Sequence, residues 1–166
     1  MSPWSRAALL SVVLGAGTVA GTVSGIVAAS AQTAKEMPRG WFLHEDLAPS
    51  LDLAFYEPTR VSFSVSCTKG YTDAVVAYRP EGKGPDGKTP MKLVLSRGAA
   101  SVSIDATGQM YRGSYTIDGT TTMTPALADL LQGGFTLSVD GKDAKTYAAT
   151  DRDRAHVRKL TQACRA

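Results

Sequence analysis

Histidine is scarce in this sequence, and the common catalytic and metal-binding patterns that depend on it are missing. His44 and His156 are the only two histidines, and neither belongs to an H-x-x-x-H or H-E-x-x-H pattern, which excludes the usual helical zinc motifs. The acidic residues that follow His44 are interpreted as part of an exposed polar turn. A G-x-S-x-G nucleophile elbow is also missing. The sequence therefore predicts no catalytic residue, no metal ligand and no cofactor, although a Ser/His/Asp site assembled in space stays open as an alternative.

A strong excess of one charge is also missing. The 18 Lys and Arg residues against 15 Asp and Glu give a formal net charge of +3 at pH 7. Nucleic-acid binding calls for a strongly basic face. A mild cluster of basic residues lies near the C-terminus and comprises Arg152, Arg154, Arg158, Lys159 and Arg165. We interpret this cluster as a solvated helix face, and no nucleic-acid partner is expected.

One segment matches the residue pattern of a nucleotide-binding motif but lacks the sequence context that the motif requires. Residues 82–89 match the P-loop pattern G-x-x-x-x-G-K-[ST], which cradles phosphate with loop amides and a following helix N-terminus. Here Pro85 removes an amide, and Asp86 puts a carboxylate where phosphate oxygens would lie. Residues 91–97 alternate like a strand, so the helix is missing. Residues 80–90 are predicted to form an exposed Gly- and Lys-rich loop that binds no nucleotide.

The N-terminal segment has the three parts of a secretory signal peptide. Arg6 precedes an uncharged stretch at residues 7–31, which ends in the small-x-small sequence Ala29-Ser30-Ala31. Cleavage after Ala31 leaves Gln32 first, so we predict a cleavable signal at residues 1–31 and one β-rich domain at residues 32–166. The alternative is a retained membrane anchor, since about 20 apolar residues span a bilayer. The run is rich in Gly, Thr and Ser, however, and lacks a basic stop-transfer cluster.

The mature part is patterned for antiparallel strands. Residues 61–67 are the clearest case, because Val61, Phe63, Val65 and Cys67 alternate with three serines, which predicts one dry and one wet face. Similar strands are expected near residues 51–56, 72–79, 91–96, 101–105, 109–118, 135–139 and 144–148. The turns between them include Thr107-Gly108 and a two-residue hairpin at Asp140-Gly141. Seven to nine short strands predict a mainly β fold, a single antiparallel β-sandwich or a barrel-like domain.

Two helices are expected within this β pattern. Thr124 and Pro125 are an N-cap and a first helical residue, and Gly133-Gly134 ends a short helix at about residues 125–132. A C-terminal helix is expected at about residues 151–164, with Thr150 and Asp153 as its capping box.

The two cysteines are predicted to form a disulfide. Cys67 lies on the apolar face of its strand, and Cys164 shares a helical stripe with Val157 and Leu160, so both thiols should point into one core. An even cysteine count in an exported chain is typical of a disulfide. Their Cα atoms should then lie roughly 4.4–6.8 Å apart.

These observations favour an exported, non-catalytic binding or interaction module in the periplasm or outside the cell. The first alternative is a small-ligand carrier with a β-barrel pocket, and the second is an unrecognised hydrolase. The partner, a protein or a small molecule, is not readable from the sequence. No stable membrane insertion is expected after signal cleavage.

Overall fold

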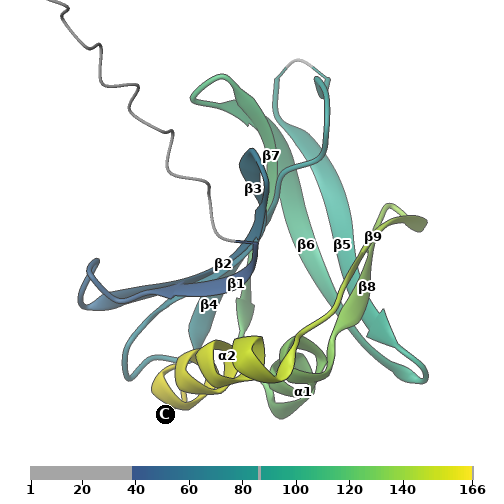
Figure 1. Cartoon of the computed structure of the whole chain (residues 1–166). Helices are drawn as coiled ribbons and strands as arrows, with labels where there is room; N and C mark the ends of the chain where they lie inside the picture. Colours follow the sequence, from purple (N-terminus) through teal and green to yellow (C-terminus); the bar gives the residue numbers. More distant parts are fainter. Residues whose placement is uncertain (1–38, 86, 166) are drawn as a thin grey trace, which may run out of the picture. The chain divides into compact units, whose positions relative to one another are not determined.

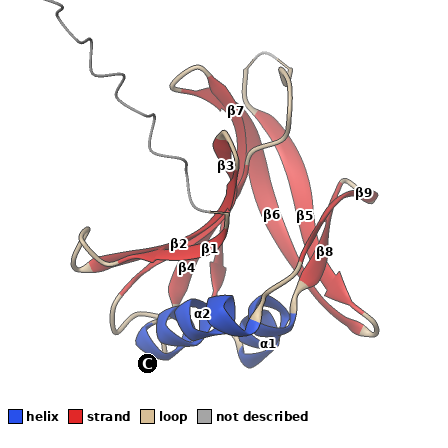
Figure 2. Ribbon diagram, viewed as in Figure 1, coloured by secondary structure: helices blue, strands red, loops and turns tan. Residues whose placement is uncertain are grey.

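The computed structural model describes residues 39–85 and 87–165, which belong to one compact unit. The predicted signal peptide and its cleavage site lie outside the described residues. Figures 1 and 2 show the strands and the two helices. In chain order the elements are β1 (Gly40–His44), β2 (Ser50–Glu57), β3 (Arg60–Thr68), β4 (Asp73–Tyr78), β5 (Thr89–Arg97), β6 (Ala100–Tyr111), β7 (Ser114–Thr122), α1 (Pro125–Gly133), β8 (Phe135–Val139), β9 (Lys142–Tyr147) and α2 (Asp151–Ala163).

All nine strands form one antiparallel sheet in the order β1-β2-β3-β4-β7-β6-β5-β8-β9. The sheet curls on itself as a half-barrel, with its apolar face inside (Figure 1). The mainly β prediction is confirmed, and of the two predicted architectures the barrel-like one describes the fold. The strand count lies at the upper end of the predicted range.

The hairpin at Asp140-Gly141 forms as predicted. Both residues have positive φ, 48° and 78°, as a type I′ turn requires, and glycine adopts such values without steric cost. Val139 pairs with Lys142 across the turn. The hairpin joins β8 to β9 and so positions the last strand of the sheet.

The predicted turn at Thr107-Gly108 is wrong. Strand β6 continues through both residues to Tyr111, and the chain turns at Arg112 and Gly113 instead. A Cβ built on Gly108 would lie 2.0 Å from the Tyr115 hydroxyl oxygen. This glycine therefore makes room for a tyrosine of the neighbouring strand, which is the other common reason for glycine inside a strand.

The prediction of a solvent-exposed serine face for residues 61–67 is also partly wrong. Ser62 and Ser64 are buried, whereas Val61 is only half-buried. The pairing of β2 with β3 shifts register between Phe55 and Tyr56, and the Tyr147 hydroxyl donates to Ser62 Oγ at 3.4 Å. Local irregularity and a distant tyrosine therefore override the simple alternation here.

Both helices form close to their predicted bounds and pack together at one end of the sheet (Figure 2). Thr124 caps α1 by accepting from the Leu127 amide at 3.2 Å, and Thr150 and Asp153 make the predicted capping box on α2. Helix α1 contacts β5 and β6, and α2 contacts β1 and β2. The predicted stripe on α2 is fully buried, so this helix closes the end of the half-barrel.

The two edge strands, β1 and β9, are joined by side chains. In the described part of the chain no backbone pairing links them, and we use the term seam for the gap between them. Five rings pack across it with centroids 5.0–6.3 Å apart, those of Trp41, Phe55, Phe63, Phe135 and Tyr147. Trp41 Nε1 also donates to the Ala148 carbonyl oxygen at 3.2 Å. The aromatic cluster thus closes the seam where hydrogen-bonded strands would otherwise be needed.

Charged side chains extend the closure along the seam. Lys145 of β9 forms an ion pair with Glu57 of β2, and Glu57 also pairs with Arg60 at 2.8 Å. Arg60 reaches Glu81 in the β4–β5 loop at 3.2 Å. The Glu57 side chain is only 16 % exposed, so it is screened less than a surface carboxylate. This chain of charges ties β9 to the opposite side of the sheet.

Candidate binding site

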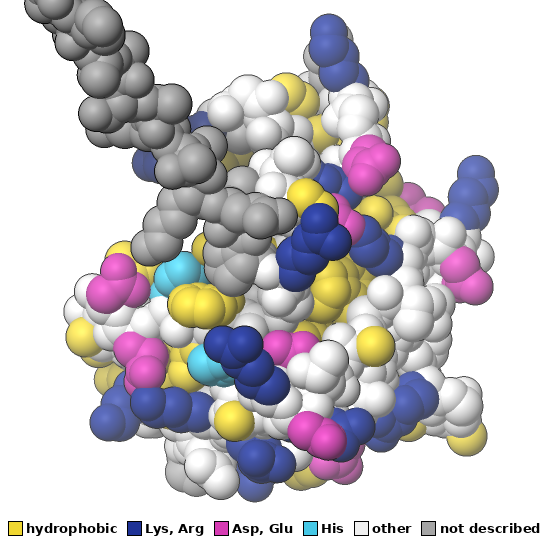
Figure 3. Space-filling model, viewed as in Figure 1, with side chains coloured by type: hydrophobic (Ala, Val, Ile, Leu, Met, Phe, Trp, Pro, Cys, Tyr) yellow, Lys and Arg dark blue, Asp and Glu magenta, His cyan; other side chains and the backbone are white. Residues whose placement is uncertain are grey.

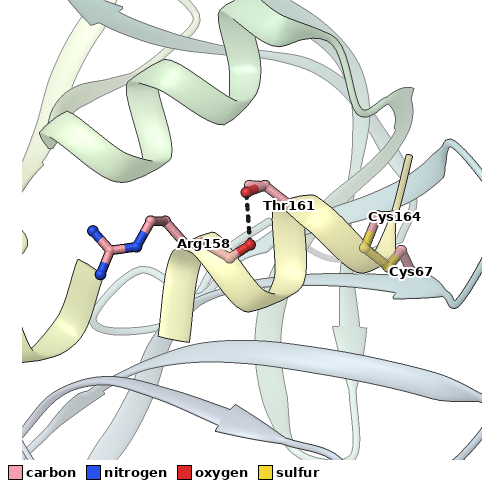
Figure 4. Close-up of a disulfide and its surroundings, with 4 residues drawn as sticks. All are labelled: Cys67, Arg158, Thr161 and Cys164. Carbon is pink, nitrogen blue, oxygen red and sulfur yellow. Dashed lines mark hydrogen bonds between the residues drawn. A yellow bond between two sulfur atoms is a disulfide. The ribbon is translucent and has the colours of Figure 1, made fainter. Parts of the chain in front are cut away.

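The structure brings the two cysteines of the predicted pair together. Cys67 lies on β3 and Cys164 ends α2, with their Cα atoms 6.1 Å apart and their sulfur atoms at bonding distance. Figure 4 shows the pair beside the last turn of α2. The Gly70 amide also donates to the Ala163 carbonyl oxygen at 2.9 Å. The end of α2 is therefore anchored to β3 and to the β3–β4 turn.

The P-loop-like segment is followed by a strand, as the sequence predicts. Residues 89–97 form β5, so no helix N-terminus follows the loop. Lys88 is exposed, and no geometry suited to a nucleotide phosphate is formed by the described part of this segment.

A serine-histidine-aspartate row does occur on the sheet, but in an unsuitable order. His44, Asp52 and Ser66 are direct cross-strand neighbours on β1, β2 and β3. Aspartate therefore lies between histidine and serine, and the imidazole is two strands, about 10 Å, from the hydroxyl. In a triad the histidine must lie between the other two. His44 Nε2 contacts the Tyr56 hydroxyl instead, at 2.7 Å.

Both histidines lie against one exposed aromatic ring, a contact that sequence reasoning missed. The ring centroids of His44 and His156 are each 5.7 Å from that of Phe42, which is 39 % exposed. In Figure 3 the two histidines flank a hydrophobic side chain. Next to them, burial raises the pKa of Asp52, and attraction to His44 and Arg79 opposes this effect. The histidines come from β1 and α2, so only tertiary packing brings them together.

No group of three or more potential metal-ligating side chains is found among residues 39–85 and 87–165. Within the same residues, no helix is both long and apolar enough to cross a membrane.

The described surface has several depressions of similar volume, and one of them lies at the end of the half-barrel opposite the helices. We refer to it as the mouth pocket. Its volume is about 380 Å³, within the lower part of the range of small-ligand sites. It is lined by Tyr78, Pro80, Glu81, Lys83, Gly84, Met91, Tyr115, Ile117, Val139, Asp140, Lys142, Asp143 and Ala144. Figure 3 shows hydrophobic side chains in a hollow edged by charges of both signs.

The floor of the mouth pocket is closely packed and largely apolar. Tyr115 is 4 % exposed, and its ring is so tightly packed that a Cβ on Gly84 or Gly108 would lie within 2.3 Å of its side-chain atoms. Its hydroxyl contacts the Met91 sulfur at 3.4 Å. Ile117 is buried beside it. The β4–β5 loop therefore rests directly on the floor, and the depth of the pocket is limited by Tyr115.

The walls carry acidic groups that already have partners in the chain. Glu81 pairs with Arg60, the Asp140 carboxylate accepts the Lys92 amide at 2.8 Å, and Asp143 accepts the Ser138 hydroxyl at 2.7 Å. In contrast, none of the ion pairs found in the described residues involves Lys83 or Lys142. Each of these exposed lysines lies on a different wall. The walls therefore offer two ammonium groups for an additional contact.

The side chain of Tyr78 also lines the pocket. Tyr78 as a whole residue is 7 % exposed, and its hydroxyl oxygen is not among the buried atoms of the described residues that lack a hydrogen-bond partner. Burial raises the pKa of Tyr78; Arg60 lowers it and Glu81 raises it. The hydroxyl therefore keeps its proton at neutral pH and can donate a hydrogen bond to a ligand.

Behind the mouth pocket, the interior of the half-barrel is filled by side chains. Phe63, Val65, Val76, Leu93, Leu95 and Leu137 are completely buried there. A carrier with an unfilled barrel interior would require an apolar cavity in this position. The space for a ligand thus lies at the mouth.

Sequence reasoning missed the mouth pocket because its signal was indistinguishable from that of an ordinary strand face. Tyr115 and Ile117 alternate along β7, as core residues do. The pocket arises because the β4–β5 loop and the β8–β9 hairpin face each other across the mouth, and these segments are about 55 residues apart in the sequence.

Comparison with known proteins gives no assignment, since no protein-family model, no curated protein and no solved structure matches this chain.

Proposed function

We propose that this chain is an exported, non-catalytic binding module of the cell envelope or the extracellular space, and that the mouth pocket is its recognition site. The observation that carries the proposal is the pocket itself, with its apolar floor and the charged side chains of both signs on its walls. Such a combination of an apolar surface with a few polar groups is typical of ligand sites. The cysteine pair at bonding distance supports export, because disulfides persist in oxidising compartments.

The alternatives have less support. A carrier would hold its ligand at the mouth only, because the interior is filled. A hydrolase would need a nucleophile beside its base, and the order His44, Asp52, Ser66 does not supply one.

The export part of the proposal predicts the mature N-terminus. When the chain is produced with its own leader, N-terminal sequencing of the exported protein should give Gln32 as the first residue. Recovery of Met1 or Ser2 in a membrane fraction would favour the retained anchor.

The binding part predicts where small molecules contact the protein. Amide spectra of the ¹⁵N-labelled mature domain, recorded against a library of small fragments, should show shifts concentrated around Tyr115, Val139 and Lys142. Ala144→Trp places a bulky ring at the pocket wall and should abolish these shifts. Ala100→Trp is the matched control, because Ala100 is exposed at the start of β6 and does not line the pocket. Shifts confined to other surfaces, or shifts unaffected by Ala144→Trp, would refute the assignment of the site.

A further inference from the structure

We infer that Glu57 is a positioning residue for the mouth pocket, because its carboxylate holds the two walls of the pocket at a fixed separation. This inference rests on the proposed function, since it concerns how the same site keeps its shape. Glu57 itself does not line the pocket, so it acts through the residues that it contacts.

The two walls lie at opposite ends of one curved stretch of the sheet. One wall is formed within residues 80–84 of the β4–β5 loop, and the other within residues 139–144 of the β8–β9 hairpin. Strands β7, β6, β5 and β8 connect β4 to β9 on the floor side. On the open side, no backbone pairing joins β9 to another strand in the described part of the chain. The separation of the walls on that side therefore depends on side chains.

A continuous series of polar contacts crosses the open side, with Glu57 at its centre. Lys145 of β9 pairs with Glu57 at the end of β2, and Glu57 pairs with Arg60 at 2.8 Å. Arg60 reaches the other wall twice, because it donates to the Arg79 carbonyl oxygen and pairs with Glu81 at 3.2 Å. Arg79 directly precedes the β4–β5 loop. Glu57 is thus the group through which one wall is connected to the other.

The central ion pairs are more enclosed than an ordinary surface pair. The side chains of Glu57, Arg60 and Lys145 are 16 %, 26 % and 29 % exposed. In the exposed pair of Lys92 with Asp105, the corresponding values are 57 % and 92 %. Partly buried charges are screened less by water and salt than exposed ones, whereas exposed pairs contribute little. The two contacts of Glu57 are therefore the ones suited to fixing the position of their partners.

Backbone order parameters of the ¹⁵N-labelled mature protein test the inference without any ligand. Glu57→Gln keeps the volume of the side chain but removes the charge that attracts both cations. Order parameters at residues 81–84 and 142–145 should both fall, towards the value of about 0.6 below which backbone is flexible. The central strands β6 and β7 should keep values of about 0.85, as in rigid backbone.

A second variant separates a connection between the walls from a local effect. Lys145→Gln removes the β9 end of the series, and it should lower the order parameters at residues 81–84 on the opposite wall as well. In the Glu57→Gln background, adding Lys145→Gln should change nothing further at residues 81–84, because the connection is already broken. Asp105→Asn is the matched control, since it removes the exposed pair with Lys92 and should leave both walls unchanged.

A loss of order confined to β9 in Lys145→Gln would overturn the inference, because the ion pair would then act only locally. Loss of order throughout the sheet in Glu57→Gln would also overturn it, since Glu57 would then serve general stability. If Glu57→Gln does not fold, the response of the opposite wall to Lys145→Gln alone decides the question. The measurements use the protein without ligand, so the fragment screen decides separately whether the mouth pocket binds.

Discussion

Replacing both cysteines with alanine, as Cys67→Ala plus Cys164→Ala, should lower the free energy of unfolding by about 2–5 kcal/mol. The bond closes a loop with a sequence separation of 97 residues, and its loss gives the unfolded chain more conformational freedom. Both side chains are also buried, Cys67 at 6 % and Cys164 at 0 % exposure, so packing is lost in addition. Helix α2 should lose hydrogen-exchange protection before the sheet, because its C-terminal end is held by this pair and by the Gly70 amide.

The two contributions are separated by comparing three samples in urea: the oxidised protein, the same protein reduced, and the double variant. The step from oxidised to reduced measures the covalent constraint, and the step from reduced to variant measures the packing. Alkylation followed by mass analysis of the natively exported protein should find no free thiol. Titratable thiols in that sample, or equal stability with and without reductant, would contradict the predicted bond.

Replacing Trp41 with alanine should cost about 3–5 kcal/mol of unfolding free energy, as for other buried aromatic residues. Trp41 is 2 % exposed and lies at the centre of the seam, where it packs against four aromatic rings and donates to the Ala148 carbonyl oxygen. No ladder of backbone hydrogen bonds substitutes for these contacts at the seam. Amide exchange in β1 and β9 should therefore increase more than in the central strands β6 and β7.

Two further substitutions define what the seam requires. Trp41→Phe keeps a ring but removes the donor, and should cost less than Trp41→Ala. Phe42→Ala is the matched control on the adjacent, outward-facing position, and as a partly exposed residue it should cost about 1 kcal/mol or less. Equal losses for Trp41→Ala and Phe42→Ala would show that the aromatic cluster does not hold the edge strands together.

The local features of the fold were predictable from sequence because neighbouring residues determine them. Thr124 and Thr150 cap their helices as predicted, and Asp140-Gly141 turns as predicted. These signals depend on hydrogen bonds and steric limits within a few residues. The inward direction of Cys67 and Cys164 followed from the periods of a strand and a helix, and both periods hold at these positions.

Strand partners and the candidate site could not be obtained in this way. Period-two alternation states which face of a strand is buried, but not which strand lies beside it, so the pairing of β4 with β7 and of β5 with β8 has no local signal. Glycine is typical of turns, but Gly108 lies inside a strand. There the Tyr115 hydroxyl of the neighbouring strand occupies the space that a side chain would fill. The contact of both histidines with Phe42 likewise depends on α2 packing against β1.

The sequence by itself thus determined the antiparallel β class, the helix ends, the hairpin and the cysteine pair, since each rests on short-range stereochemistry or on one periodicity. Tertiary structure alone decided the order of the nine strands, the aromatic seam and the mouth pocket. The physical reason is that these features arise where segments far apart in the chain meet, and their formation depends on how the whole sheet curls to bury its apolar face.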